Sequence, residues 1–334
     1  MLYLPKPSTA DLARFAESVK KVIENNVASS TIPDKAKAYL DENRIVKILI
    51  DTSDKLIRYH REFMPLLIEG FCEKEYKKYF KIRLKQKKKR SLVETTLINK
   101  YDEERKKLLD IFDYDKIISK SKAKSYSLAS TLNRFTCTYC NRLYTNTIIT
   151  KTDKGSKINN GHRISRPQFD HWFAHSIYPI LGMSFYNLIP SCSVCNSSVK
   201  GDEVFDLSTH IHPYMYDNTE VFKFSFEHKS LKDLKVKIIV KKGSRMENHL
   251  MSFKIKEVYD AHSSMELKDL LELRYKYSEN YIHELFYNTF KSLEISEKEV
   301  YRMVFGLELE EENFHKRPFS KFKYDIIKEL LTIE

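Results

Sequence analysis

Two short cysteine motifs, Cys137-Thr-Tyr-Cys140 and Cys192-Ser-Val-Cys195, are separated by 51 residues in this chain of 334 residues. Each C-x-x-C pair can present two thiolates from one tight turn, and two pairs complete the four-sulfur shell that zinc prefers in structural sites. Buried free thiols or a redox pair are the alternatives, although the sequence lacks the βαβ pattern on which a redox motif belongs. The spacing therefore predicts that Cys137, Cys140, Cys192 and Cys195 bind one structural Zn²⁺.

The fifth cysteine, Cys72, makes the count odd, which argues against a disulfide framework. We expect Cys72 to be a small buried hydrophobic residue. No apolar run approaches 18 residues, and no segment has the apolar core and small-residue cleavage site of a signal peptide. We therefore expect a cytoplasmic protein that does not contact a membrane.

The residues between the cysteine motifs include candidates for phosphodiester hydrolysis. They contain the stretches Phe169–Phe173 (FDHWF) and Tyr186–Pro190 (YNLIP), and Asn196 directly follows the last cysteine. The oxygens of Asp170 and Asn196 are ligands that suit a hard divalent ion, which leaves open positions for phosphate and water. A histidine beside such a ligand, His171, can accept the proton of water near neutral pH.

The order of these motifs, ending in Lys-Gly, makes residues 135–215 resemble the HNH endonucleases, also called ββα-metal nucleases. The resemblance implies that Asp170 binds a catalytic Mg²⁺ or Mn²⁺ and that His171 is the general base. It implies that Asn187 holds the loop that carries the base. It also makes Asn196 the second protein ligand of the catalytic ion, as in an H-N-N variant of the family.

The resemblance and the neighbouring residues suggest further contacts to nucleic acid. Lys200 matches a basic residue that is often seen after the helix turn of the family, and Arg166 is a candidate phosphate contact on the preceding strand. His175 is a candidate second acid or phosphate contact, with loop packing as the alternative. The chain departs from the family pattern at Ala174, where many members have proline, and in the longer, more aromatic stretch 172–186.

The charge distribution also indicates a polyanionic partner. The chain has 58 Lys and Arg against 46 Asp and Glu, a formal net charge of +12. Residues 51–200 carry 29 basic and 15 acidic side chains, whereas residues 251–334 carry 13 basic and 17 acidic ones. The basic excess therefore surrounds the motifs described above, which favours nucleic acid as a partner.

The segment Lys74–Arg90 is strongly basic, with ten basic residues and one acidic residue among seventeen. Aromatic and aliphatic residues are interleaved with these charges. The segment is therefore either a solvated helix face with a packed apolar side or a surface that contacts phosphate. We expect its last cluster to be exposed and treat it as a candidate nucleic-acid site: Lys87, Lys88, Lys89 and Arg90.

Hydrophobic periodicity predicts an α+β protein. Apolar residues recur every three or four positions at 10–30, 35–82, 262–291 and 321–332, which predicts helices. Residues 220–227 and 234–241 alternate with period two and predict an antiparallel pair of strands. Between Leu143 and Gly201 we expect a strand at 143–150, a turn at 153–161, a weaker strand at 162–169 and a helix that begins near 194.

These elements suggest three consecutive regions. They are a helical, basic N-terminal region at 1–130, a zinc-stapled nuclease core at 131–215, and a C-terminal region at 216–334 with a β-hairpin and helices. The amino-acid sequences of the FDHWF and NLIPSC stretches and the overall order of the regions resemble the HNH subunit of Septu-type anti-phage defence systems. That resemblance implies a controlling ATPase as a partner.

Three functions from different classes are consistent with the sequence. An active endonuclease that cuts DNA is favoured, because Asp170, His171, Asn187 and Asn196 are all present. An RNA-cleaving toxin would use the same site. A zinc-stapled protein that binds nucleic acid or acts as a scaffold without catalysis fits the charge equally well, but it has no use for that set of residues.

Overall fold

The computed structural model describes residues 2–150, 162–201, 203–230, 233–277, 279–289 and 295–332. The chain divides into two compact units. Unit 1 contains Met1–Pro5, Asn133–Phe169 and Pro190–Glu334, and unit 2 contains Lys6–Leu132 and Asp170–Ile189. The turn expected at 153–161 lies outside the described residues. Each unit therefore combines segments that are far apart in the sequence.

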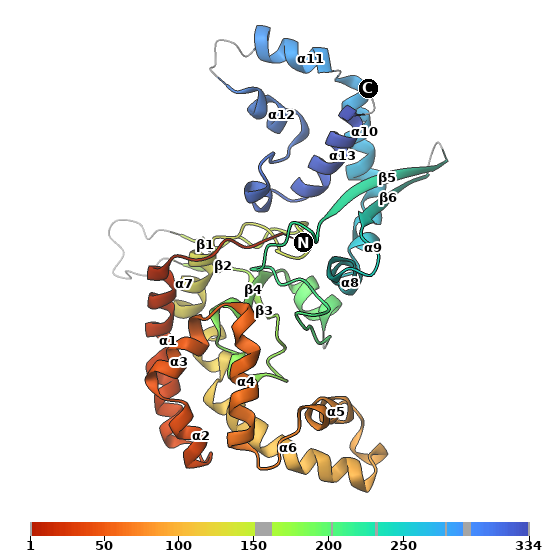
Figure 1. Cartoon of the computed structure of the whole chain (residues 1–334). Coiled ribbons are helices and arrows are strands. Elements are labelled where there is room, and N and C mark those ends of the chain that lie inside the picture. The colour runs from red at the N-terminus through yellow and green to blue at the C-terminus, as the bar shows by residue number, and fades with distance from the viewer. Residues whose placement is uncertain are drawn as a thin grey trace, which may run out of the picture. The chain divides into compact units, whose positions relative to one another are not determined.

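Unit 2 is mostly helical (Figure 1). Within it α1 packs against α3, α2 against α4, and α5 against α6. Its helices are α1 (Thr9–Ser29), α2 (Asp34–Tyr39), α3 (Glu42–Ile50), α4 (Ser53–Leu67), α5 (Glu73–Arg83), α6 (Leu92–Ile111) and α7 (Lys122–Leu132).

Side-chain caps set the beginnings of several of these helices. Ser8 accepts a hydrogen bond from the Asp11 amide at the start of α1, and Asp41 does the same for α3. Ser91 and Glu94 form a reciprocal capping box at the start of α6. The helices predicted at 10–30 and 35–82 are thus present, the second divided into α2 to α5, of which α3 begins at a side-chain cap.

The second segment of unit 2, Asp170–Ile189, is held to the helices of that unit by hydrogen bonds in both directions. Ser184 Oγ donates to the Ile48 carbonyl at 2.6 Å, and Tyr76 Oη donates to the Ile177 carbonyl at 2.9 Å. The segment contains two short 3₁₀ helices, Pro179–Leu181 and Phe185–Asn187. It is almost entirely buried, so the surrounding helices determine its path.

Unit 1 contains small antiparallel sheets followed by helices (Figure 1). Strands β5 (Phe222–Ser230) and β6 (Asp233–Val240) form an antiparallel pair in which Phe224 is opposite Ile238, which confirms the predicted pair. The helices that follow are α8 (Arg245–Ser252), α9 (Ile255–Asp260), α10 (Lys268–Lys276), α11 (Glu279–Glu284), α12 (Glu297–Phe305) and α13 (Ser320–Thr332). Together the two units confirm a mixed class of helices and small antiparallel sheets.

The strands between the cysteine motifs are shorter than the sequence predicts. β1 is only Ile148–Ile149, because residues 143–145 bond to the first cysteine turn, as the Cys137 amide does to the Leu143 carbonyl at 3.0 Å. The strand expected at 162–169 is divided into β2 (Arg163–Ser165) and β3 (Gln168–His171). Pro167 stands between them and has no amide hydrogen to donate.

Two other expectations are modified. Residues 194–200 form a π helix, Val194–Lys200, in place of an ordinary α helix. Cys72, expected to be buried, is exposed, because it precedes α5 at the surface of unit 2. β3 and β4 (Leu188–Ser191) form a two-stranded sheet, and the boundary between the units along the chain lies within each of these strands. Among the described residues no helix combines the length and the apolar character that crossing a membrane requires.

Candidate functional site

The four cysteines predicted to bind zinc come together in unit 1. Cys137, Cys140, Cys192 and Cys195 are all buried, and their sulfur atoms lie within 4.8 Å of one another. This spacing suits a single tetrahedral ion. The predicted convergence of the two motifs is therefore confirmed, and the cluster can hold a metal ion such as zinc.

The first cysteine turn depends on Asn141. Its backbone has a φ of 48°, a left-handed conformation that asparagine tolerates better than most residues. That conformation lets the Asn141 amide return to the Cys137 carbonyl at 2.9 Å. The Asn141 side chain donates to the Phe314 carbonyl at 2.9 Å, and Tyr259 Oη donates to the Cys140 carbonyl at 2.6 Å. The C-terminal part of unit 1 therefore supports the cysteine turn.

The second cysteine turn directs backbone amides toward a sulfur atom and a carbonyl. The Cys195 amide donates to Cys192 Sγ at 3.4 Å, and the Asn196 amide donates to the Cys192 carbonyl at 3.0 Å. An amide that points at a sulfur atom favours its thiolate form. Local backbone geometry thus prepares Cys192 for a cation.

The thiols influence one another strongly because they are close and buried. Hydrogen bonds from Cys137 lower the pKa of Cys140 and of Cys192 below the ordinary thiol value, whereas burial raises the pKa of Cys137. Four buried thiolates without a cation would repel each other, so the cluster cannot ionise fully by itself. A divalent cation removes this conflict, which is the chemical reason to expect a metal here.

His171 lies in unit 2 at the end of β3, directly after the buried Asp170. Its Nε2 lies 2.9 Å from the Gly182 carbonyl oxygen. Because a carbonyl oxygen only accepts, Nε2 is the protonated nitrogen, and Nδ1 carries the lone pair of the neutral ring. Tyr114 and the imidazole pack in a T-shaped arrangement with a centroid distance of 4.5 Å. The Gly182 carbonyl and Tyr114 therefore both contact the His171 ring.

His175 stacks on His171 with ring centroids 4.9 Å apart and an interplanar angle of 20°. Burial lowers the pKa of the His175 imidazole, so this ring is neutral at neutral pH. The structure gives His175 a packing contact with the candidate base. Its predicted role as a nucleic-acid contact stays a prediction.

Asn187 is fully buried in unit 2 and ties the residues directly after His171 to the later part of the same segment. Its Oδ1 accepts from the Phe173 amide at 2.6 Å, and its Nδ2 donates to the carbonyls of Phe173 at 3.1 Å and Leu181 at 2.9 Å. Its backbone carbonyl accepts from the Trp172 amide at 3.0 Å. These bonds are those of a residue that fixes the loop next to the candidate base.

Asn196, the predicted second ligand of the catalytic ion, belongs to unit 1. Its Nδ2 donates to Gln168 Oε1 at 2.9 Å within that unit. This bond assigns the amide nitrogen to Gln168 and makes Oδ1 the atom available as a metal ligand.

The candidate nucleic-acid residues have different surroundings. Lys87, Lys88 and Lys89 are exposed, as expected, and no ion pair to them is found among the described residues. Arg90 instead donates to the carbonyls of Arg83 and Lys85, both at 2.8 Å, and so closes the end of α5.

Arg166 and Lys200 both pack against aromatic rings of unit 1. The Arg166 guanidinium lies 5.5 Å from the Phe169 centroid, and its Nη1 donates to the Pro167 carbonyl at 2.9 Å. Lys200 is buried, with Nζ 4.8 Å from the Phe205 centroid. Their phosphate contacts stay predictions.

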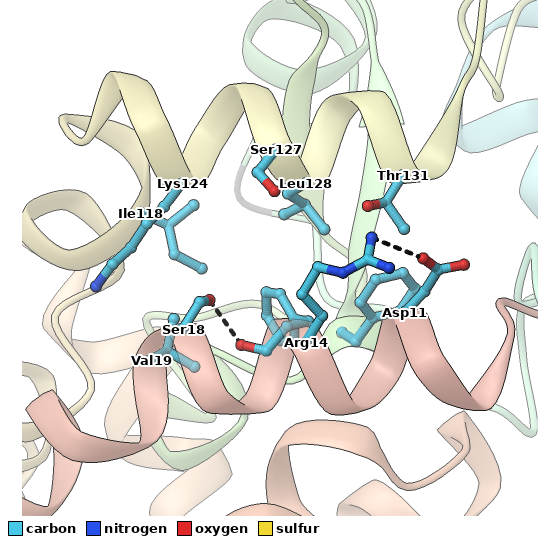
Figure 2. Close-up of a pocket in the computed structure, with 11 residues that line it drawn as sticks. Asp11, Arg14, Ser18, Val19, Ile118, Lys124, Ser127, Leu128 and Thr131 are labelled. Atoms are coloured by element: carbon cyan, nitrogen blue, oxygen red, sulfur yellow. Dashed lines mark hydrogen bonds and ion pairs between the residues drawn. The ribbon is translucent and has the colours of Figure 1, made fainter.

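Unit 2 also contains a small cavity between α1 and α7 (Figure 2). Figure 2 shows Lys124 and Thr131 of α7 facing α1, where Arg14 pairs with Asp11 at 3.3 Å. The cavity volume of about 60 Å³ is far below the roughly 300–1,000 Å³ of small-molecule sites. We assign no function to it.

The described residues thus define a protein of helices and small antiparallel sheets with a buried four-cysteine cluster that can hold a metal ion such as zinc. Comparison with known proteins finds no matching family model, no matching curated protein and no matching solved structure. The likeness to HNH nucleases therefore rests on the sequence motifs.

Gly182 is a functional candidate that the sequence did not indicate, and its replacement makes a sharp prediction. A Cβ on Gly182 would lie 2.3 Å from His175 Cδ2, so Gly182→Ala must displace the ring that stacks on His171. We expect a loss of about 1–3 kcal/mol of stability. The double variant Gly182→Ala/His175→Ala should recover most of the stability in thermal melts. Equal stability of Gly182→Ala and wild type would contradict this packing.

Proposed function

We propose that this protein is a metal-dependent endonuclease of the HNH type, with DNA as the favoured substrate. The observation that carries the proposal is the position of His171. This residue directly follows the buried Asp170, and its Nε2 is hydrogen-bonded to the Gly182 carbonyl. Asp170 and Asn196 are the proposed ligands of Mg²⁺ or Mn²⁺. The assignment of Asn196 as a ligand rests on the sequence motif. The four cysteines hold a structural Zn²⁺ in this proposal.

The chemistry requires a base that can accept one proton. As the water oxygen bonds to phosphorus, the phosphorus–oxygen bond to the leaving group breaks, and the water proton passes to His171 Nδ1. The leaving oxygen takes a proton from solvent. A divalent ion bound by Asp170 would neutralise charge on the phosphate and on the leaving oxygen.

Positioning residues support this assignment. Asn187 makes three side-chain hydrogen bonds to the backbone around His171 and is completely buried. A buried asparagine with all these partners holds its loop in one geometry, which a proton transfer needs because small displacements reduce its rate.

The charge of the chain supports a nucleic-acid substrate. The formal net charge is +12, with the excess in residues 51–200. The resemblance of the FDHWF and NLIPSC stretches to Septu-type proteins extends the proposal to bacterial anti-phage defence and to a controlling ATPase. Both extensions rest on the resemblance of the motifs.

A cleavage assay tests the proposal. Supercoiled plasmid, single-stranded DNA and single-stranded RNA are incubated with the protein and Mg²⁺, Mn²⁺ or EDTA, alone and with the proteins encoded by neighbouring genes. We expect cleavage of DNA with either ion and none with EDTA. Cleavage of RNA alone would identify the RNA-cleaving alternative. Binding without cleavage under all conditions would reject the endonuclease in favour of the zinc-stapled binding protein.

The three exposed lysines Lys87–Lys89 make a separate prediction about binding. Replacing all three by serine should lower DNA affinity and reduce the slope of log affinity against log salt by about 3, because each phosphate contact contributes about 0.9. Fluorescence anisotropy across a salt series measures this slope. The control variant replaces Lys241, Lys242 and Lys256 by serine. These lysines are also exposed, and their replacement removes the same amount of positive charge. An equal loss in both variants would show that only net charge matters.

A further inference from the structure

Unit 1 contains a large cavity that the proposed endonuclease activity does not use. Its volume is about 880 Å³, and the N-terminal residues Leu2–Pro5, strand β5 and helix α13 contribute to its lining. Side chains of Leu4, Phe222 and Phe314 give it an apolar wall. Its volume lies within the roughly 300–1,000 Å³ range of pockets that enclose small molecules.

One lining residue, Arg134, is buried and charged. Only 4% of its surface is exposed, and burial lowers the pKa of its guanidinium to about 10, which still leaves it charged at neutral pH. Its Nη2 donates to the Tyr3 carbonyl at 3.3 Å, whereas its buried Nε has no hydrogen-bond partner. Among the described residues no carboxylate forms an ion pair with Arg134.

A buried guanidinium without a counter-ion is costly, because it has lost its hydration without gaining an opposite charge. The acidic residues that line the cavity have other partners. Asp325 pairs with Lys321 at 2.9 Å, and Glu220 pairs with Arg245 at 3.2 Å. Glu329 accepts a hydrogen bond from Ser225 at 2.9 Å. None of these interactions compensates Arg134.

The neighbouring histidine does not change this balance. His315 also lines the cavity, and burial lowers its pKa to about 4, so it is neutral at pH 7. Glu311 and Glu312 lie at exposed positions, where solvent screens their charge. Arg134 is therefore a buried cation in a lining that also includes the apolar residues Leu4, Phe222 and Phe314.

We propose that this cavity binds a small anionic amphiphile, whose carboxylate or phosphate pairs with Arg134 and whose apolar body lies against Leu4, Phe222 and Phe314. An anion beside the Arg134 guanidinium would neutralise the buried charge. The proposal is independent of the endonuclease activity, because no residue assigned to that activity lines the cavity.

The test uses 1-anilinonaphthalene-8-sulfonate as a fluorescent anionic amphiphile, with decanoate and naphthyl phosphate as competitors. We expect one saturable site per chain, displaced by at least one competitor. The competitor that displaces at lower concentration distinguishes a carboxylate ligand from a phosphate ligand. Fluorescence that does not saturate, or that neither competitor reduces, would overturn the proposal.

Two variants locate the site. Arg134→Met keeps the apolar stem and removes the charge, so affinity should fall about 10- to 100-fold. Ile239→Trp fills the cavity from a half-exposed lining position and should also abolish binding. The matched control is Ile164→Trp, which changes an exposed isoleucine outside the cavity and should bind like wild type. Unchanged affinity in Arg134→Met would overturn the proposal.

Thermal melting separates a ligand contact from a structural role. Without ligand, Arg134→Met should melt at the same temperature as wild type or higher, because it removes an uncompensated buried charge. A clearly lower melting temperature would assign Arg134 to the stability of unit 1 and would also overturn the proposal.

Discussion

Replacing Cys192 by serine is expected to remove stoichiometric zinc and to unfold unit 1 at a much lower temperature than wild type. Structural zinc contributes about 10–16 kcal/mol in small zinc-dependent folds, whereas the net stability of a domain is about 5–15 kcal/mol. Loss of one thiolate therefore removes an energy comparable with the whole stability. A loss of about 5 kcal/mol lowers Tm by roughly 10–20 °C for a unit of this size.

Metal analysis and circular dichroism measure this result. The matched control is Cys72→Ser, because Cys72 is exposed and lies in unit 2. We expect the control to keep one zinc per chain and the melting temperature of wild type. A Cys192→Ser protein with one zinc and an unchanged melt would contradict a four-cysteine metal site.

Replacing His171 is expected to have the largest effect on catalysis. His171→Ala and His171→Gln should both lower the rate of DNA cleavage by at least about 100-fold, since general base catalysis typically contributes 10²–10⁴-fold. Glutamine can still donate to the Gly182 carbonyl in place of Nε2, but it cannot accept the proton of water. The two variants therefore separate the loss of the base from the loss of packing against Tyr114 and His175.

Plasmid cleavage under single-turnover conditions gives the rates, and metal analysis should still find one zinc per chain in both variants. His162→Ala serves as the control, since His162 is exposed and lies in unit 1. Wild-type rates in His171→Gln would remove His171 from the role of base. A proportional loss in the control would point to a general effect of removing a histidine.

Local patterns in the sequence were sufficient for several features. The period-two alternation at 220–227 and 234–241 led to the β5–β6 pair, because one face of the pair is packed and the other is exposed. The helices of the N-terminal region followed from apolar spacing in the same way. The elements between the cysteine motifs were less predictable, since Pro167 and the turn at Cys137 interrupt the strands.

The residues that surround the candidate sites were not recognisable from the sequence. In the sequence Gly182 is an ordinary loop glycine. In the structure its carbonyl is hydrogen-bonded to His171, and a Cβ at this position would clash with His175. Asn141 had no motif of its own, although it fixes the first cysteine turn. Arg134 was one basic residue among 58 Lys and Arg, and what distinguishes it is burial without an ion-paired carboxylate among the described residues.

The sequence by itself determined the two C-x-x-C pairs and the residues Asp170, His171 and Asn196 as the places where chemistry is expected. Such motifs depend on residue type and short spacing, which a chain displays without being folded. The tertiary structure decided that the four sulfur atoms meet within 4.8 Å, that Nε2 of His171 is the protonated nitrogen, and that Arg134 is buried. These properties depend on contacts between residues far apart in the chain, and only the folded packing brings such residues together.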